Sequence, residues 1–122
     1  MTGIDKVATL TIAVKDQNEA LRWFTEKLDF EKRVDISAPG IRWLTVAPRQ
    51  QTEVEFVLAS WFTELVGKNA PCVVETQDCR GTYKALRDRG VKFSQTPTEK
   101  PYGTEAVFED LYGNTYALVE RR

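Results

Sequence analysis

Residues 7–28 read VATLTIAVKDQNEALRWFTEKL, and this stretch decides the fold because a strand pattern runs directly into a helix pattern. Its first eight residues are rich in β-branched side chains and alternate, which predicts a strand over 7–14. Asp16, followed by Glu19, predicts a capped helix start in which the carboxylate of Asp16 accepts from a free backbone amide. Four apolar residues then recur at helical spacing and give the helix one face that packs on a sheet: Ala20, Leu21, Phe24 and Leu28.

The rest of the first half predicts only strands. They are expected at 30–35, 41–47 and 53–58, with a turn through Pro39 and Gly40 between the first two. The second half repeats the order strand, helix, strand, strand, strand. Its helix is capped by Asp78 and ends at Gly90, where a left-handed cap favours glycine. Its strands are expected at 71–76, 91–95, 104–109 and 115–120.

An offset of 62 residues superimposes the two halves, because it carries the cap Asp16 onto Asp78 and the inner-face Phe24 onto Leu86. We therefore predict an α+β fold of two tandem βαβββ modules, at about 4–60 and about 70–122. With 122 residues, the chain is expected to form a single domain over 1–122.

Composition excludes several classes of function. Seventeen basic and eighteen acidic residues give a charge of −1, with no basic stripe for nucleic acid and no polybasic run for a membrane surface. There is no histidine, which rules out Ser-His and Cys-His nucleophilic pairs within the chain. No glycine-rich turn has nucleotide-binding spacing, so no cofactor is expected. The two cysteines and the absence of a signal-peptide pattern lead us to expect a cytoplasmic protein.

Alternation along the strands separates two sheet faces. One face is apolar and should pack under the helices. The other mixes small residues, hydroxyls, a tryptophan and carboxylates, which suits the wall of a ligand cleft. A solvent-exposed sheet face and a subunit interface are the alternatives. The residues of this second face are Thr9, Thr11, Ala13, Trp43, Thr45, Glu53, Glu55, Thr115, Ala117 and Val119.

Three segments of the chain resemble the vicinal oxygen chelate superfamily, which includes glyoxalase I, extradiol dioxygenases, and fosfomycin- and bleomycin-resistance proteins. They are VKDQNEALRWFTEKLDF at 14–30, RWLTVAP at 42–48 and FEDLYGNTYALVE at 108–120. The resemblance covers essentially the whole chain and rests on the helix start and the late glycine–asparagine turn. It implies two modules whose curved mixed sheets close around a cleft.

The resemblance also implies two inward-facing metal ligands in each half, one on its first strand and one on its last. Counted from the matched turns, these positions are Thr9, Glu55, Pro71 and Ala117. Only Glu55 is a competent ligand, whereas a catalytic metal needs three or more protein donors. We therefore expect no bound metal. Glu120 should lie on the face opposite Ala117, and a one-residue bulge that turns Glu120 or Glu75 inward would overturn this expectation.

The chemistry that remains favours binding over catalysis. Glu55 and Glu53 could act as a base, but we expect no catalytic residue and interpret Glu55 as lining the cleft. Cys79, at a helix start where a thiol pKa can fall, has no basic partner. Aromatic side chains beside a carboxylate suit flat or cationic ligands. The ligand-binding candidates are Thr9, Trp43, Glu55, Trp61 and Tyr102.

By analogy with bleomycin-resistance proteins, the resemblance implies a homodimer that sequesters a small aromatic or amphipathic molecule without a metal. The alternative is a lyase, isomerase or dioxygenase that uses a divalent metal or Glu55. A third possibility is a regulatory module whose cleft is vestigial. The missing ligand set beside an aromatic, carboxylate-bearing face makes the metal-independent binder our leading hypothesis.

Overall fold

A computed structural model describes residues 2–122, which form two compact units divided between Phe62 and Thr63. Each unit holds one α-helix and one four-stranded mixed sheet, so the predicted α+β fold with two βαβββ modules is confirmed. None of the helices within residues 2–122 is long and apolar enough to cross a bilayer.

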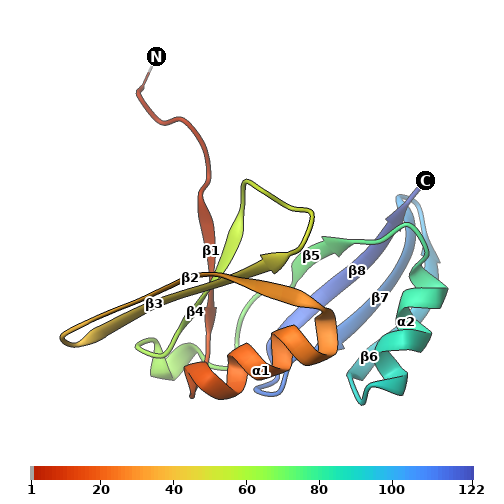
Figure 1. Cartoon of the computed structure of the whole chain (residues 1–122). Helices are drawn as coiled ribbons and strands as arrows, with labels where there is room; N and C mark the ends of the chain where they lie inside the picture. The colour runs from red at the N-terminus through yellow and green to blue at the C-terminus, as the bar shows by residue number, and fades with distance from the viewer. Residues whose placement is uncertain (1) are drawn as a thin grey trace. The chain divides into compact units, whose positions relative to one another are not determined.

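The first unit has the sheet order β1-β4-β3-β2, in which β1 and β4 are parallel and the other pairs antiparallel. Its helix α1 packs against β2, β3 and β4, and the β2–β3 hairpin is long (Figure 1). Its elements are β1 (Thr9–Ala13), α1 (Gln17–Leu28), β2 (Phe30–Ala38), β3 (Ile41–Pro48) and β4 (Glu55–Ala59).

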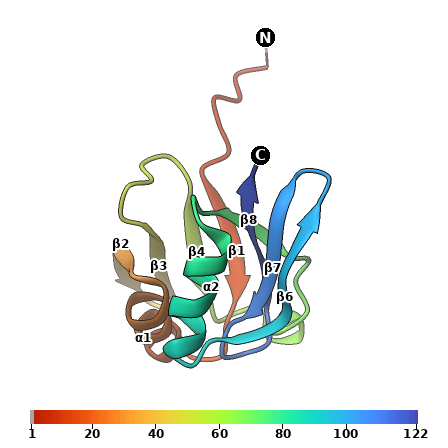
Figure 2. The same cartoon turned by 90° about the vertical axis from the view of Figure 1, so that its right-hand side faces the viewer.

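The second unit repeats this topology with the order β5-β8-β7-β6, and β5 runs parallel to β8. Its helix α2 packs against β6, β7 and β8 (Figure 2). Its elements are the 3₁₀ turn η1 (Thr63–Leu65), β5 (Cys72–Glu75), α2 (Cys79–Asp88), β6 (Lys92–Lys100), β7 (Gly103–Glu109) and β8 (Thr115–Arg121).

Both helices begin as predicted. The side chain of Asp16 accepts a hydrogen bond from the backbone N–H of Glu19 at 2.9 Å. The side chain of Asp78 accepts from the N–H of Gly81 at 3.0 Å. These bonds satisfy amides that have no partner inside the helix. Gly90, just past α2, has φ 89°, the left-handed conformation for which glycine was expected.

Strand β6 extends beyond its predicted end at residue 95, to Lys100. Pro97 interrupts the pattern, but it lies within the register shift between Gln95 and Thr98 on an edge strand of the sheet. A residue without an N–H is tolerated there because the sheet loses no ladder hydrogen bond.

A buried polar turn joins β7 to β8 in the second unit, and its hydrogen bonds explain the polar residues Asp110 and Asn114 in the motif FEDLYGN. The carboxylate of Asp110 accepts from the backbone amides of Tyr112 and Asn114, from the Asn114 side chain and from the Tyr116 hydroxyl, the last at 2.7 Å. Burial, and then the charge of Asp110, raises the pKa of Tyr116 far above its usual range. The side-chain oxygen of Asn114 also accepts from the amide of Gly67. The motif therefore connects the turn both to β8, through Tyr116, and to the segment before β5, through Gly67.

Candidate functional site

The sheet of the first unit has one face turned away from α1, which we call helix-free face 1: Thr9, Ile36, Trp43, Thr45, Glu55 and Val57. Phe56 contacts the ring of Phe24 in α1, so its neighbours Glu55 and Val57 point to the other side. The predicted division of the strands into two faces is therefore confirmed in this unit.

Glu55 is half-buried on this face, and Thr45 holds it in place. The Thr45 hydroxyl donates to Oε1 of Glu55 at 2.7 Å, and its own oxygen accepts the N–H of Val34 at 3.0 Å. The N–H of Val34 is available to the Thr45 side chain because the β2–β3 register shifts between Lys32 and Val34. Thr45 is completely buried. The N–H of Val34 at the bulge therefore donates to the Thr45 hydroxyl, which in turn donates to the Glu55 carboxylate.

Thr9 and Trp43 complete the part of the predicted site that lies on helix-free face 1. Thr9 is the register partner of Glu55 in the parallel β1–β4 pair. Trp43 is 39% exposed, and its partner across the hairpin, Ile36, is 63% exposed. Three of the five candidates thus share one face, with an accessible indole at one end of it.

The other two candidates lie elsewhere. Trp61 follows the end of β4, and its ring contacts Phe62 with centroids 6.0 Å apart. Tyr102 belongs to the second unit, in the turn between β6 and β7. It is half-exposed, and its hydroxyl donates to Oε2 of Glu105 at 2.8 Å.

Glu105 is the residue that sequence analysis missed. Its register partner is Val119, so it lies on the face of the second sheet that also carries Ala117. Gln95 donates to its Oε1 at 3.3 Å, so two side chains hold this carboxylate. The sequence pattern that could have indicated Glu105 is the alternation over 103–109. Ala106 and Phe108 are buried on the helix side, so Glu105 lies on the opposite face.

The repeat is shorter at its end than the 62-residue offset predicted. Leu10 pairs with Phe56 in the first unit, and its equivalent Cys72 pairs with Tyr116 in the second. The register counterpart of Glu55 is therefore Thr115, so the predicted 62-residue equivalence of Glu55 with Ala117 was wrong, while Ala117 stays the position that the resemblance implies. The paired residues Val107 and Ala117, on either side of the Asp110 turn, are two residues closer in sequence than their counterparts Thr45 and Val57 in the first unit.

Glu120 and Glu75 are the two carboxylates that were expected to need a bulge to turn toward the face of Ala117. Glu120 lies on the opposite side, as predicted, and its Oε1 accepts the N–H of Cys79 at the start of α2. Glu75 pairs with Val119 without any register shift, so it shares the face of Ala117. The expectation that Glu75 needs a bulge to reach that face was wrong, because residues two apart on a regular strand share a face.

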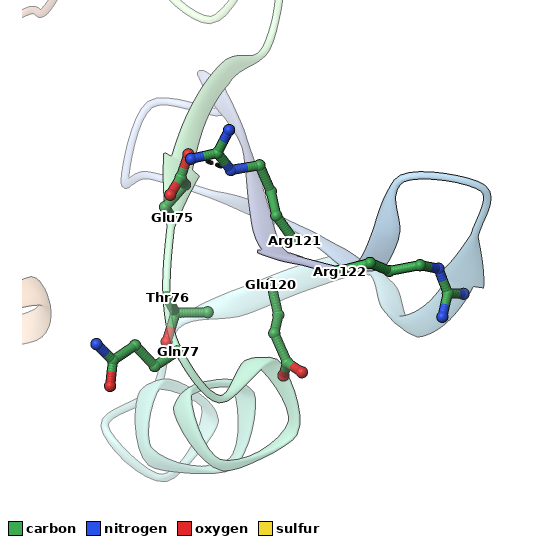
Figure 3. Close-up of a pocket in the computed structure, with 6 residues that line it drawn as sticks. All are labelled: Glu75, Thr76, Gln77, Glu120, Arg121 and Arg122. Carbon is green, nitrogen blue, oxygen red and sulfur yellow. Dashed lines mark ion pairs between the residues drawn. The ribbon is translucent and has the colours of Figure 1, made fainter.

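These two carboxylates belong to an open pocket of about 470 Å³ in the second unit, lined by Glu75, Thr76, Gln77, Glu120, Arg121 and Arg122. Figure 3 shows Arg121 reaching Glu75, with which it forms an ion pair at 2.9 Å, while Glu120 points the other way. Arg122 pairs with Glu99. The pocket includes none of the five candidates, and its charges are already partnered.

Cys79 does not have the lowered thiol pKa that a helix start can produce. It is completely buried, and this burial raises its pKa, with the nearby charge of Glu120 as the next cause. Its Sγ lies 3.6 Å from the carbonyl of Leu118. We interpret Cys79 as a packing residue.

The residues present do not fit a metal centre. At the four positions where the resemblance implies ligands, only Glu55 has a strong donor, and its Oε1 already accepts from Thr45; the register counterpart Thr115 would add only a neutral hydroxyl. Within residues 2–122, no three histidine, cysteine, aspartate or glutamate side chains are grouped to hold a metal ion.

Comparison with known proteins places these features in a family context. Residues 3–118 match the model of the Glyoxalase/Bleomycin resistance protein/Dioxygenase superfamily. The uncharacterized protein YurT of Bacillus subtilis (strain 168) is 31% identical, over 95% of this chain and 99% of its own. The crystal structure of UcmS2 is 38% identical with a TM-score of 0.86, covering 96% of this chain and 98% of that one. TnmS3, an antibiotic binding protein from Streptomyces sp. CB03234, is 28% identical with a TM-score of 0.90, and each chain is covered completely.

Proposed function

The chain belongs to the Glyoxalase/Bleomycin resistance protein/Dioxygenase superfamily, and from this membership we propose that it is a metal-independent binder of a small aromatic or amphipathic molecule. One observation carries the proposal. The implied ligand positions of this chain offer a single carboxylate, Glu55, and a protein hydroxyl already engages it.

Two further observations support binding. TnmS3, which aligns over the whole chain, is an antibiotic binding protein. Helix-free face 1 combines a partly exposed indole, Trp43, with the carboxylate of Glu55 and the hydroxyl of Thr9. Such a surface takes up a flat ring by stacking and a polar group by hydrogen bonding. We propose that this face lines the ligand cleft.

We also propose that the protein acts as a homodimer. The β2–β3 hairpin exposes three large apolar side chains, Ile36 (63%), Ile41 (46%) and Trp43 (39%), and an apolar cluster of this kind is typical of an interaction surface. Static light scattering at micromolar concentration should give twice the mass of the chain, and a monomer would contradict the proposal.

The function is tested by separating binding from metal chemistry. The purified protein is dialysed and its metal content measured by elemental analysis, and then thermal-shift assays are run with a panel of aromatic natural products. We expect less than a stoichiometric amount of any metal and a rise in Tm with at least one compound class. One equivalent of Zn, Ni, Mn or Fe retained per chain would instead support the lyase, isomerase or dioxygenase. The absence of any thermal shift would support a vestigial cleft.

A further inference from the structure

We propose that Glu55 is the recognition group for a positively charged nitrogen on the ligand, and that Thr45 is the positioning residue that fixes this carboxylate. The inference rests on the proposed function and names its ligand class, a cationic aromatic amine.

The first step is the charge balance of helix-free face 1. Glu55 is half-buried, and no lysine or arginine of the described chain pairs with it; its recorded side-chain partner is the Thr45 hydroxyl. Glu31, on β2 of the same unit, differs because Arg33 pairs with it at 2.8 Å. A partly buried carboxylate without a counter-charge is costly unless something else supplies the charge.

The second step is the direction of the hydrogen bonds. The Thr45 oxygen accepts the N–H of Val34, and the single hydroxyl proton is donated to Glu55, so both roles of this hydroxyl are used. Thr45 is completely buried in the central part of the sheet, so this donor does not rotate away. Oε1 of Glu55 is therefore fixed by the protein, and Oε2 keeps its capacity to accept from a ligand.

The third step is the neighbouring ring. Trp43 lies two residues before Thr45 on β3, and alternation places it on the same face with its side chain partly exposed. The β3–β4 register places Trp43 opposite Ala59, four residues along β4 from Glu55, so a flat ligand whose charged nitrogen meets Glu55 can extend its rings toward the indole. An anionic ring compound of the same size keeps the stacking but is repelled by Glu55.

The proposal is tested with two fluorescent probes of similar shape and opposite charge, 9-aminoacridine (a cation at neutral pH) and acridine-9-carboxylate (an anion). Titration gives the ratio of the anion Kd to the cation Kd for each variant. For wild type we expect a ratio well above one. In Glu55→Gln it should fall about tenfold, the loss of one charge-assisted hydrogen bond. The matched control Glu26→Gln, an exposed carboxylate of α1 on the helix side of the sheet, should leave it unchanged.

Thr45 is tested by the same ratio, which a merely structural role would not move. Thr45→Val removes the hydroxyl at nearly constant volume and should lower the ratio severalfold, while Thr45→Ser should restore it. Tight binding of both probes with a ratio near one, or a ratio that Glu55→Gln leaves intact, would overturn this inference but leave the binding function standing. Failure of both probes to bind would contradict the proposed function together with the inference. If Thr45→Val does not fold, Glu55→Gln and Thr45→Ser still decide.

Discussion

The hydroxyl of Thr45 lies 2.7 Å from Oε1 of Glu55, at the one implied metal-ligand position in the first unit that carries a carboxylate. The Thr45 oxygen accepts a hydrogen bond from the N–H of Val34 at a β-bulge, and its hydroxyl donates one to the carboxylate. Thr45 thus fixes one oxygen of the only carboxylate at the implied ligand positions, and those positions supply no second strong metal ligand. This arrangement supports a binding surface rather than a metal centre.

Thr45 should also matter for stability. Thr45→Val leaves the buried amide of Val34 without its acceptor, and a buried unsatisfied donor costs about 1–3 kcal/mol. Urea denaturation should show this loss of unfolding free energy, whereas Thr45→Ser should retain most of the stability. Equal midpoints for Thr45→Val and wild type would show that the bulge amide finds another acceptor.

The Asp110 turn is predicted to be the most sensitive polar site of the second unit. Tyr116→Phe removes one of the four donors to its carboxylate and should cost about 1 kcal/mol. Asp110→Asn should cost more, about 3 kcal/mol, because its amide would direct hydrogens at donors in a buried site. Urea midpoints in the order wild type, Tyr116→Phe, Asp110→Asn would agree with this; the reverse order of the two variants would not.

Trp43 should contribute directly to ligand affinity. Trp43→Phe keeps an aromatic side chain but removes the larger indole, so Kd for 9-aminoacridine should rise roughly threefold to tenfold. The matched control is Trp23→Phe, since Trp23 lies in α1 with its ring against Phe24. Similar affinity losses in the two variants would place binding somewhere other than helix-free face 1.

Tyr102 should titrate at unusually high pH. Its hydrogen bond to Glu105, with burial as the next cause, raises its pKa above the ordinary value for tyrosine of about 10. A pKa that is raised in the folded state stabilises the fold fully below the unfolded value, and this contribution is lost as pH rises through the folded pKa. Its effect is therefore confined to alkaline pH.

The phenolate absorbance in a spectrophotometric titration measures this shift. Glu105→Gln should bring one tyrosine back toward the ordinary range, and Tyr102→Phe should remove that same transition from the curve. An unchanged curve in Glu105→Gln would show that the hydrogen bond does not persist in solution.

Local patterns were sufficient to predict the order of the elements. Asp16 and Asp78 form their caps within three residues of the chain, so the sequence contains all the information that these helix starts require. The division of the strands into two faces also follows from alternation alone, which is why Thr9, Trp43 and Glu55 were correctly placed together.

What depends on long-range register was harder to predict. The equivalence of Glu55 with Thr115 depends on the length of the turn that Asp110 closes, and an offset counted from the helices does not record it. The bond from Thr45 to Glu55 depends on a β-bulge in a third strand. Alternation could have placed Glu105 on its face, but the hydrogen bonds from Tyr102 and Gln95 that hold its carboxylate depend on the fold.

The central claim, binding without a metal, is tested most directly by one titration. The protein is treated with a chelator, dialysed, and titrated with 9-aminoacridine, first alone and then with an excess of Zn²⁺, Ni²⁺, Mn²⁺ or Fe²⁺. Our account predicts saturable binding by the metal-free protein, with a Kd that each metal leaves unchanged. Binding that appears only after a metal is added would contradict it.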